Sequence, residues 1–477
     1  MQIAPVPLSA HASAPKVQHT AYLWAITLVA AMGGLLFGYD WVVIGGARQF
    51  YEAYFQLTSE HLIGWANSSA LVGCFVGSFA AGYLGNRFGR RRVLLVSAIL
   101  FAISSVLTGW SYSFPMFIFW RIVGGTAIGL SSNISPLYIA EISPASIRGQ
   151  LVSLNQFAIV VGILLAQIAN WKIARPIPEH ISHIAFLQTW NVQYGWRWMF
   201  CAVVVPAIMF TVMSLFIPES PRWLLTKGRD DSAYEVLTRV GGPSYASSEI
   251  ANIKRMLQLE VGMKATWRDL WLPGVRRVVL IGAALAVLQQ WTGINILFNY
   301  AAEVYRGAGY GENDILLNIV ITGTINLIFT VLAMLIVDRV GRRPMMLFGC
   351  IGIGLSHLLS GMAYRASWHG SAVLVLTLSA IGCYALTLAP VTWVLIAEIF
   401  PNRVRSQAVS VAVSALWIAS FALTYTFPLI NRALGSSDTF LGYGAICMLG
   451  AAFIFAFVPE TKGRTLEEIE TRVLSPN

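Results

Sequence analysis

Charged residues are scarce in this chain. Of its 477 residues, only 11% are Asp, Glu, Lys or Arg, whereas soluble domains carry roughly 25%. Hydrophobic residues make up 56%, and the mean hydropathy is +0.66. A water-facing globule of this size needs more polar side chains, so a soluble enzyme and a disordered chain are both excluded. The composition indicates an integral membrane protein of many helices.

Cysteine is also rare, and the position of each cysteine excludes a disulfide or zinc framework. All five lie inside apolar segments, where they are typical of small buried hydrophobic residues. They are Cys74, Cys201, Cys350, Cys383 and Cys447. A cleavable signal peptide is not expected either, because residues 1–20 are polar and the first apolar block is too long for one.

A net charge of +10 could indicate a nucleic-acid partner, but the basic residues do not gather on one domain with aromatic residues between them. They lie in loops between apolar blocks. With both termini assigned to one side of a membrane, that side receives most of the lysines and arginines. The other side receives Arg48, Lys172, Arg175, Arg197, Arg306, Arg365 and Arg432. This asymmetry predicts that both termini are cytoplasmic.

Apolar windows of about 20 residues are long enough to cross a bilayer. The sequence contains twelve such windows: 22–48, 62–84, 92–111, 114–139, 149–171, 196–217, 277–301, 314–337, 344–364, 371–396, 407–428 and 440–458. Residues 218–276 interrupt the series and carry charges at amphipathic spacing. We expect short surface helices there.

Three motifs occur twice, once in each half of the chain. NRFGRR (86–91) recurs as DRVGRR (338–343), and PES (218–220) recurs as PET (459–461). Glu141 with Arg148 recurs as Glu398 with Arg405. We therefore predict two homologous six-helix halves, 22–217 and 277–458, a linker at 218–276, and cytoplasmic tails at 1–21 and 459–477. Paired halves of this kind form alternating-access transporters with a site at the bilayer midplane.

Asp40 and Arg121 lie inside predicted spans one and four. Charges at membrane depth are costly, and pairing them costs least. A carboxylate facing a buried arginine can accept a proton from one side and release it to the other. We therefore expect this pair to couple proton movement to conformation. The alternative is a static ion pair, or an aspartate that reaches the membrane interface.

Further motifs, in a fixed order, make the chain resemble the sugar porter family of the major facilitator superfamily over about residues 22–470. Besides the repeated loops they are GLLFGYD (34–40), PLYIAE (136–141), PESPRW (218–223), QQWTGIN (289–295), AEIFP (397–401) and PETKG (459–463). The run SLNQFAI (153–159) is most similar to that of bacterial D-xylose–proton symporters.

The resemblance implies an all-α integral membrane fold with twelve transmembrane helices in two pseudo-symmetric halves and short intracellular linker helices. It also implies a monomer of the bacterial inner membrane that imports a monosaccharide, of xylose or hexose type, by alternating access. In the family's glucose uniporters the position of Asp40 is typically Asn, so the acid here favours proton symport. A passive sugar uniporter remains the first alternative. A sugar-sensing receptor is the second, and the short segment after Pro459 disfavours it.

A pyranose presents hydroxyl groups around its edge and weakly apolar faces, so it is bound by amides and aromatic rings. Uncharged amides lie deep in predicted spans five, seven and eight: Gln156, Gln289, Gln290, Asn295 and Asn326. The resemblance assigns sugar contacts to these five and to Trp393 and Trp417. The three amides of span seven can reach one cavity if the helix bends near Gly293. Hydrogen bonding between helices and ordinary packing are the alternatives for the amides and the tryptophans, respectively.

Three positions depart from the family pattern. Asn299 precedes Tyr300 where the family usually has two tyrosines, and Leu416 stands where related porters place an amide. These two changes put the sugar preference in doubt. Asn86 replaces the more usual aspartate in the first copy of the arginine-rich loop, which would weaken the network of that half.

The charges of the repeated loops form a second set of candidate residues. In the first half they are Arg87, Arg90, Arg91, Glu141, Arg148 and Glu219; in the second half they are Arg339, Arg342, Arg343, Glu398, Arg405 and Glu460. The resemblance implies that they form inter-helix salt bridges that hold the outward-facing state. Simple retention of positive charge in the cytoplasm is the alternative, and it leaves the repeated glutamates unexplained.

Weaker signals indicate no enzyme, cofactor or metal site. Glu179, His180 and His183 have metal-like spacing but lie in a predicted external loop without further ligands. Gly352 and Gly354 match only a fragment of a dinucleotide-binding fingerprint and are typical of helix packing. The sequence has no nucleophile elbow and no phosphate-binding loop, so we expect no covalent catalysis.

Overall fold

The computed structural model describes residues 20–178, 181–261, 267–368, 370–401 and 403–462, and all regular structure in these ranges is helical. The first half contains α1 (Thr20–Tyr54), α2 (Glu60–Phe88), α3 (Arg90–Gly109), α4 (Phe114–Ile142), α5 (Arg148–Ile173), α6 (His183–Leu187), a π-helical turn (Asn191–Gly195), α7 (Trp196–Cys201) and α8 (Val204–Ser214). The linker contains α9 (Pro221–Thr226), α10 (Asp230–Gly241), α11 (Pro243–Val261) and a 3-10 turn (Trp267–Trp271). The second half contains α12 (Val275–Trp291), α13 (Ile294–Asn299), α14 (Ala301–Gly307), α15 (Glu312–Val340), α16 (Arg342–Arg365), α17 (Ser371–Leu386), α18 (Leu388–Ile399) and α19 (Arg405–Phe457).

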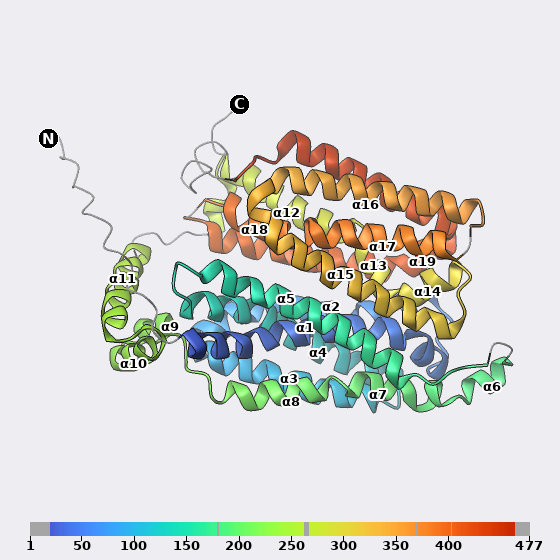
Figure 1. Cartoon of the computed structure of the whole chain (residues 1–477), viewed down its shortest axis with the longest axis horizontal. Coiled ribbons are helices and arrows are strands. Elements are labelled where there is room, and N and C mark those ends of the chain that lie inside the picture. The colour runs from blue at the N-terminus through green and yellow to red at the C-terminus, as the bar shows by residue number, and fades with distance from the viewer. Residues whose placement is uncertain (1–19, 179–180, 262–266, 369, 402, 463–477) are drawn as a thin grey trace.

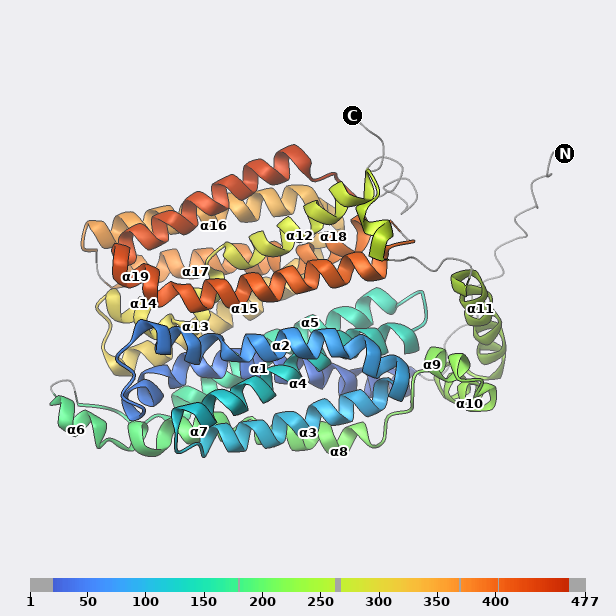
Figure 2. The same cartoon turned by 180° about the vertical axis from the view of Figure 1, so that it is seen from behind.

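The two halves lie side by side with their long helices roughly parallel, and α9, α10 and α11 form a small cluster at one end (Figures 1 and 2). We call this the linker end and the opposite one the far end. Helix α1 begins and α19 finishes at the linker end (Figure 1). The expected linker helices are therefore present. Most of the predicted tails lies outside the described residues.

Eleven helical segments of the described chain are long and apolar enough to cross a membrane. The last helix, α19, has 53 residues, which at 1.5 Å per residue is about 80 Å, more than twice the bilayer core of about 30 Å. It reverses direction at Gly435, where φ is 79° and ψ is 163°. After this break Ser437 bonds Gly361 near the end of α16, and Phe455 bonds Arg343 near its start. Because α19 supplies two crossings, the expected twelve spans are present.

Two spans are interrupted within their length. Span seven is α12 followed by α13, and Gly293 between them has a left-handed backbone (φ 80°). His357 Nε2 donates to the Thr292 carbonyl (2.9 Å), and a Cβ on Gly293 would lie 3.2 Å from the same ring nitrogen. The bend expected near Gly293 is thus present and is held by a neighbouring helix. Span ten, expected to be continuous, is interrupted at Thr387, whose φ of −128° and ψ of −85° are not helical.

Small residues allow close helix contacts, most clearly between α2 and α4. A Cβ on Gly73 would lie 2.0 Å from the Ile122 carbonyl oxygen, and one on Gly125 would lie 1.8 Å from that of Ala70. Gly77 and Gly129 make the same kind of contact one turn further along. This reciprocal pair of small-xxx-small motifs brings the two backbones together, which stabilises helix pairs where lipid removes the hydrophobic driving force.

The outer surface of the bundle is apolar. Phe79, Phe216, Leu335, Leu449 and Phe455 are each at least 66% exposed. In a water-soluble protein such a surface would mark an association site, but on a chain with this many spanning helices it is the surface that lipid tails cover.

Helix α1 is longer than expected. The apolar window ended at residue 48, whereas the helix continues to Tyr54. Arg48 was expected in a loop, yet it is 7% exposed inside the helix. Its charge is compensated by Glu52 and Glu303, as described below, and for this reason the helix can bury it.

Candidate functional site

Asp40 of α1 and Arg121 of α4 form a buried ion pair. Arg121 Nη1 donates to both carboxylate oxygens of Asp40 at 3.1 Å. The two residues are 4% and 3% exposed, and the guanidinium carbon lies 5.5 Å from the centre of the Phe200 ring. Arg121 Nε has no hydrogen-bond partner among the described residues. The sequence-based pairing of these two residues is therefore what the structure contains, with one donor left unused.

The amides of span seven form a short chain across the bend. Asn295 on α13 donates to Gln290 Oε1 (2.6 Å), Gln290 donates to Gln289 Oε1 (3.4 Å), and Gln289 donates to the Leu388 carbonyl (3.3 Å) at the start of α18. Gln289 and Gln290 are 3% and 7% exposed. The breaks in spans seven and ten therefore meet at these amides. Each amide keeps unused donors or acceptors that a hydroxylated ligand could engage.

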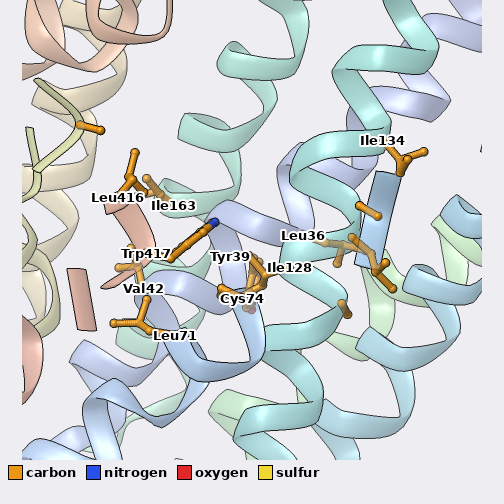
Figure 3. Close-up of a cluster of buried hydrophobic side chains, with 14 of the residues drawn as sticks. Leu36, Tyr39, Val42, Leu71, Cys74, Ile128, Ile134, Ile163, Leu416 and Trp417 are labelled. Carbon is orange, nitrogen blue, oxygen red and sulfur yellow. The ribbon is translucent and has the colours of Figure 1, made fainter. Parts of the chain in front are cut away.

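Trp417 of α19 lies at the contact between the halves. Its ring centre is 6.2 Å from that of Phe37 and 6.1 Å from that of Trp41, both on α1. It belongs to the buried cluster drawn in Figure 3, together with Val42, Leu71 and Leu416. The indole N–H has no partner among the described residues, so an aromatic face and a free donor occur together.

In the described part of the chain, the other three residues expected to contact sugar are not hydrogen-bonded to the span-seven amides. Asn326 on α15 is 4% exposed and Gln156 on α5 is partly buried. Trp393 on α18 is 41% exposed, which makes it the least buried of the seven. Among the described residues, no side-chain hydrogen bond links any of these three to Gln289, Gln290 or Asn295.

At the linker end, the first-half loop is organised by two glutamates. Glu141 accepts two hydrogen bonds from the Arg90 guanidinium, at 2.8 and 2.9 Å, and one from the Ser220 hydroxyl at 2.6 Å. Glu219 accepts the backbone N–H groups of Arg90 (2.8 Å) and Arg91 (3.1 Å) at the start of α3. A carboxylate there satisfies donors that a helix leaves unpaired and complements the helix dipole.

The second half repeats this arrangement. Glu398 receives Arg342 (3.3 Å) and the Thr461 hydroxyl (2.6 Å), and Glu460 accepts the backbone N–H groups of Arg342 and Arg343 at 3.1 Å each. The turns that precede α3 and α16 are both made by a glycine with positive φ, 97° at Gly89 and 105° at Gly341. The internal repeat is therefore also a structural one.

The remaining arginines of the candidate network bond other groups. Arg91 and Arg343 donate to the carbonyls of Leu215 and Phe455. Three further arginines donate to groups four or five residues away in the sequence: Arg87 to the Tyr83 hydroxyl, Arg148 to the Ser143 carbonyl, and Arg405 to the Phe400 carbonyl. Arg339 is exposed, and its carbonyl accepts Lys462. Asn86, the departure from the family pattern, accepts Arg90 at 3.2 Å, so the acceptor at this position is retained.

Two ion pairs join the halves at the far end. Arg48 of α1 bonds Glu303 of α14 (2.8 Å) and Glu52 (2.6 Å), and its guanidinium carbon lies 4.3 Å from the Tyr300 ring centre. Arg432 of α19 bonds Glu60 of α2 at 2.9 Å. We call the first group, Arg48 with Glu52, Tyr300 and Glu303, the far-end cluster.

The family model described as "Sugar (and other) transporter" matches residues 26–472. The chain belongs to this family. It is 38% identical to the D-xylose-proton symporter of Escherichia coli (strain K12), with 95% of this chain and 96% of that one covered. It is 35% identical to the arabinose-proton symporter of Bacillus subtilis (strain 168), with 98% and 99% covered. The inward open structure of the E. coli xylose transporter XylE aligns with a TM-score of 0.82 at 38% identity, over 94% of this chain and 100% of that one.

As a member of the sugar transporter family, the protein is a membrane transporter of the major facilitator type and not an enzyme. Among the described residues, no group of three or more histidine, cysteine or acidic side chains could hold a metal ion. Of the three residues with metal-like spacing, Glu179 and His180 lie outside the described residues.

The sequence analysis missed several buried amides, two of which lie near the boundary between the halves. Gln167 of α5 is 1% exposed, and neither its amide nitrogen nor its oxygen has a partner among the described residues. It lies against Gly323 of α15 in the other half. Asn67 of α2 is 4% exposed with an unpaired oxygen. Gln167 could have been found, because it follows Gln156 by three helical turns on the same face.

Proposed function

We propose that this protein imports a monosaccharide together with a proton by alternating access. The observation that carries the proposal is the Asp40–Arg121 ion pair, which is buried inside a transporter bundle. A charge pair in such a place is expensive to maintain and is a functional site by default. The printed names of two similar proteins, a D-xylose and an arabinose symporter, support the choice of substrate class and of proton as coupling ion.

In the proposed cycle, Asp40 accepts a proton from the outside and the sugar enters between the halves. Neutral Asp40 no longer compensates Arg121, so the pair loosens and the first half can rearrange. The halves then rock about the site, and sugar and proton leave on the other side. Because the two ligands bias the same two-state equilibrium, each raises the affinity for the other.

The sugar would be bound by the amides and indoles that the sequence predicts: Gln156, Gln289, Gln290, Asn295, Asn326, Trp393 and Trp417. The bonds from Asn295 to Gln290 and from Gln290 to Gln289 support this role, because they hold three amides at one bend. Trp417, with an aromatic face and an unpaired N–H, suits a pyranose ring with its hydroxyls at the edge.

The linker end is assigned to the cytoplasm, with both termini there and the bundle in the bacterial inner membrane as a monomer. The excess of lysine and arginine in loops of that end supports this orientation. Under it, the far end faces outward and is closed by the Arg48–Glu303 and Arg432–Glu60 pairs. The repeated linker-end residues would form the cytoplasmic network that holds the far-end-open state once the two halves meet there; in this structure the ion pairs of Arg90 and Arg342 each lie within one half.

The test uses purified protein in liposomes loaded with a pH-sensitive dye, challenged in turn with xylose, arabinose, glucose and galactose. We expect acidification of the interior that depends on one or more of these sugars. Asp40→Asn should abolish both acidification and uphill accumulation while sugar exchange continues, which also shows that the variant is folded. Sugar entry without a pH change would make the protein a passive uniporter, and Asp40→Asn with intact accumulation would remove Asp40 from the mechanism.

A further inference from the structure

A small cavity lies between the proton pair and the second half. Its walls include Arg121, Asn67 and Leu71 from the first half and Asn299 from α13 of the second. It leaves about 10 Å³ for the centre of a water-sized sphere, which is about what one ordered water needs. The cavity thus spans the boundary at which the halves must move relative to each other.

Three polar atoms with no partner among the described residues belong to side chains that line this cavity. They are the Nε of Arg121 and the side-chain oxygens of Asn67 and Asn299. The residues are 3%, 4% and 3% exposed. A buried polar group without a partner costs more free energy than a hydrogen bond contributes, so three around one small cavity need an explanation.

A single water bound in the cavity would satisfy all three atoms. It would accept the Arg121 N–H and donate its two hydrogens to the oxygens of Asn67 and Asn299, which are the usual three bonds of a buried water. The side-chain nitrogen of Asn67 already donates a hydrogen bond to the Ile63 carbonyl at 2.9 Å. This bond fixes the side chain so that its oxygen is the atom left over.

Asn299 also has a position that links the two ligand sites. It lies four residues, about one helical turn, after Asn295 on the half-helix α13, and Asn295 belongs to the amide chain at the bend. A Cβ on Gly45 of α1 would lie 2.4 Å from the Phe298 carbonyl oxygen, so α13 already touches the helix that carries Asp40. A pull on Asn299 would therefore move Asn295.

We propose that Asn67 and Asn299 are positioning residues that couple the two ligands: a water held between them joins Arg121 of the proton pair to the half-helix that binds the sugar. This inference rests on the proposed function. When a proton neutralises Asp40, the guanidinium of Arg121 turns to the nearest other acceptors, which are this water and the two amide oxygens. The attraction draws α13 toward the first half and tightens the sugar site.

Other titratable groups near the pair do not provide this link. They include Tyr39 and Tyr51 of α1, the second of which has its hydroxyl within reach of Asn67, and Cys74 of α2; phenols and thiols ordinarily keep their protons at and below neutral pH. None of them lies on the second half, whereas Asn299 does. A pH effect on sugar affinity therefore has to cross the boundary through the cavity or through the sugar itself.

The experiment compares the KM for sugar uptake at about pH 5.5 and about pH 7.5. Both values lie below the ordinary pKa of a thiol or a phenol. The wild-type KM should rise with pH, because loss of the proton from Asp40 weakens sugar binding. Asn299→Leu and Asn67→Leu should each reduce the ratio of the two KM values by about fivefold, or to one, as expected for loss of one hydrogen bond. Asn299→Leu should also transport fewer protons per sugar.

Two controls make the result specific. Asn318→Leu changes a buried asparagine of α15 that is 6% exposed and also has an unpaired amide atom, but that does not line the cavity; it should keep the wild-type ratio. The double variant of Asn67 and Asn299 should behave as the more affected single variant, because both side chains bind the same water. Additive effects, or single variants with the wild-type ratio, overturn the proposal. If the wild type itself moves no protons with sugar, the proposed function fails and not this inference alone.

Discussion

At the scale of single residues, the Asp40–Arg121 ion pair was predictable because the physical choice is narrow. Asp40 and Arg121 are isolated charges within apolar spans, and pairing them is the arrangement with the lowest cost. Amides carry a weaker signal, since any buried glutamine can be satisfied by a neighbouring carbonyl. Gln289 illustrates this point: it donates to the Leu388 carbonyl and still remains a candidate sugar ligand.

Replacement of Gln289 therefore separates the two roles. We expect Gln289→Ala to raise the sugar Kd about tenfold, which corresponds to about 1.4 kcal/mol and to the loss of one or two hydrogen bonds. Isothermal titration calorimetry on purified protein measures it. Asn318→Ala, a buried amide outside the candidate site, is the matched control and should leave Kd within about twofold. Equal affinities for both variants would assign Gln289 to structure alone.

Residues missed by the sequence analysis were missed for a physical reason. Hydropathy reports whether a side chain is costly in lipid, not which partner it finds. Which arginine side chain of each loop pairs with a glutamate was not predicted: Arg90 and Arg342 reach Glu141 and Glu398 from the first position after a positive-φ glycine, Gly89 or Gly341. Asn67 could not be predicted as a candidate, because the cavity that it lines is completed by Asn299 of α13, far along the chain.

At the scale of helices, spans could be predicted closely and their interruptions only in part. The bend at Gly293 was expected, since a glycine follows an amide-rich segment. The break at Thr387 was not expected, although Pro390 follows three residues later, cannot donate to the Leu386 carbonyl and crowds it. The break also allows a close contact between helices, since the Thr387 hydroxyl would lie 2.1 Å from a Cβ on Gly349 of α16.

Helix packing gives a prediction at the same scale. A Cβ on Gly125 would lie 1.8 Å from the Ala70 carbonyl, so Gly125→Ala must push α2 and α4 apart. We expect it to destabilise the protein by about 1–3 kcal/mol, as overpacking does, and to lower the melting temperature in detergent. Gly82→Ala, on α2, has no atom within 4 Å of the added Cβ. As an exposed helical glycine it should be neutral or stabilising by up to about 1 kcal/mol. A similar melting temperature for both variants would contradict the close contact.

At the scale of the whole molecule, the internal repeat predicts two halves, but it does not predict how they are tilted. The same sequence must adopt at least two arrangements in order to transport, so the choice between them is made by small free-energy differences. In this structure the ion pairs Arg48–Glu303 and Arg432–Glu60 join the halves at the far end.

The far-end cluster should therefore bias the conformational equilibrium. Arg48 is 7% exposed and bonds a glutamate on each half, so Arg48→Ala leaves Glu303 without its partner across the boundary. We expect the far-end-closed state to lose about 2 kcal/mol, roughly a 30-fold shift in population. Spin labels on Thr58→Cys and Asp314→Cys, exposed positions on the two halves, should report longer distances by pulsed electron resonance.

Arg365→Ala is the matched control for this prediction. Arg365 forms an ion pair with Asp438 at 2.6 Å, but both residues belong to the second half and their side chains are 68% and 48% exposed. Exposed pairs contribute little, and this one does not cross the boundary, so the label distances should match those of the parent protein. If Arg48→Ala also left the distances unchanged, closure of the far end would depend on apolar contacts such as Trp65 with Phe421, whose ring centres are 6.0 Å apart across α2 and α19. The charges would then serve only to let α1 continue past the membrane core.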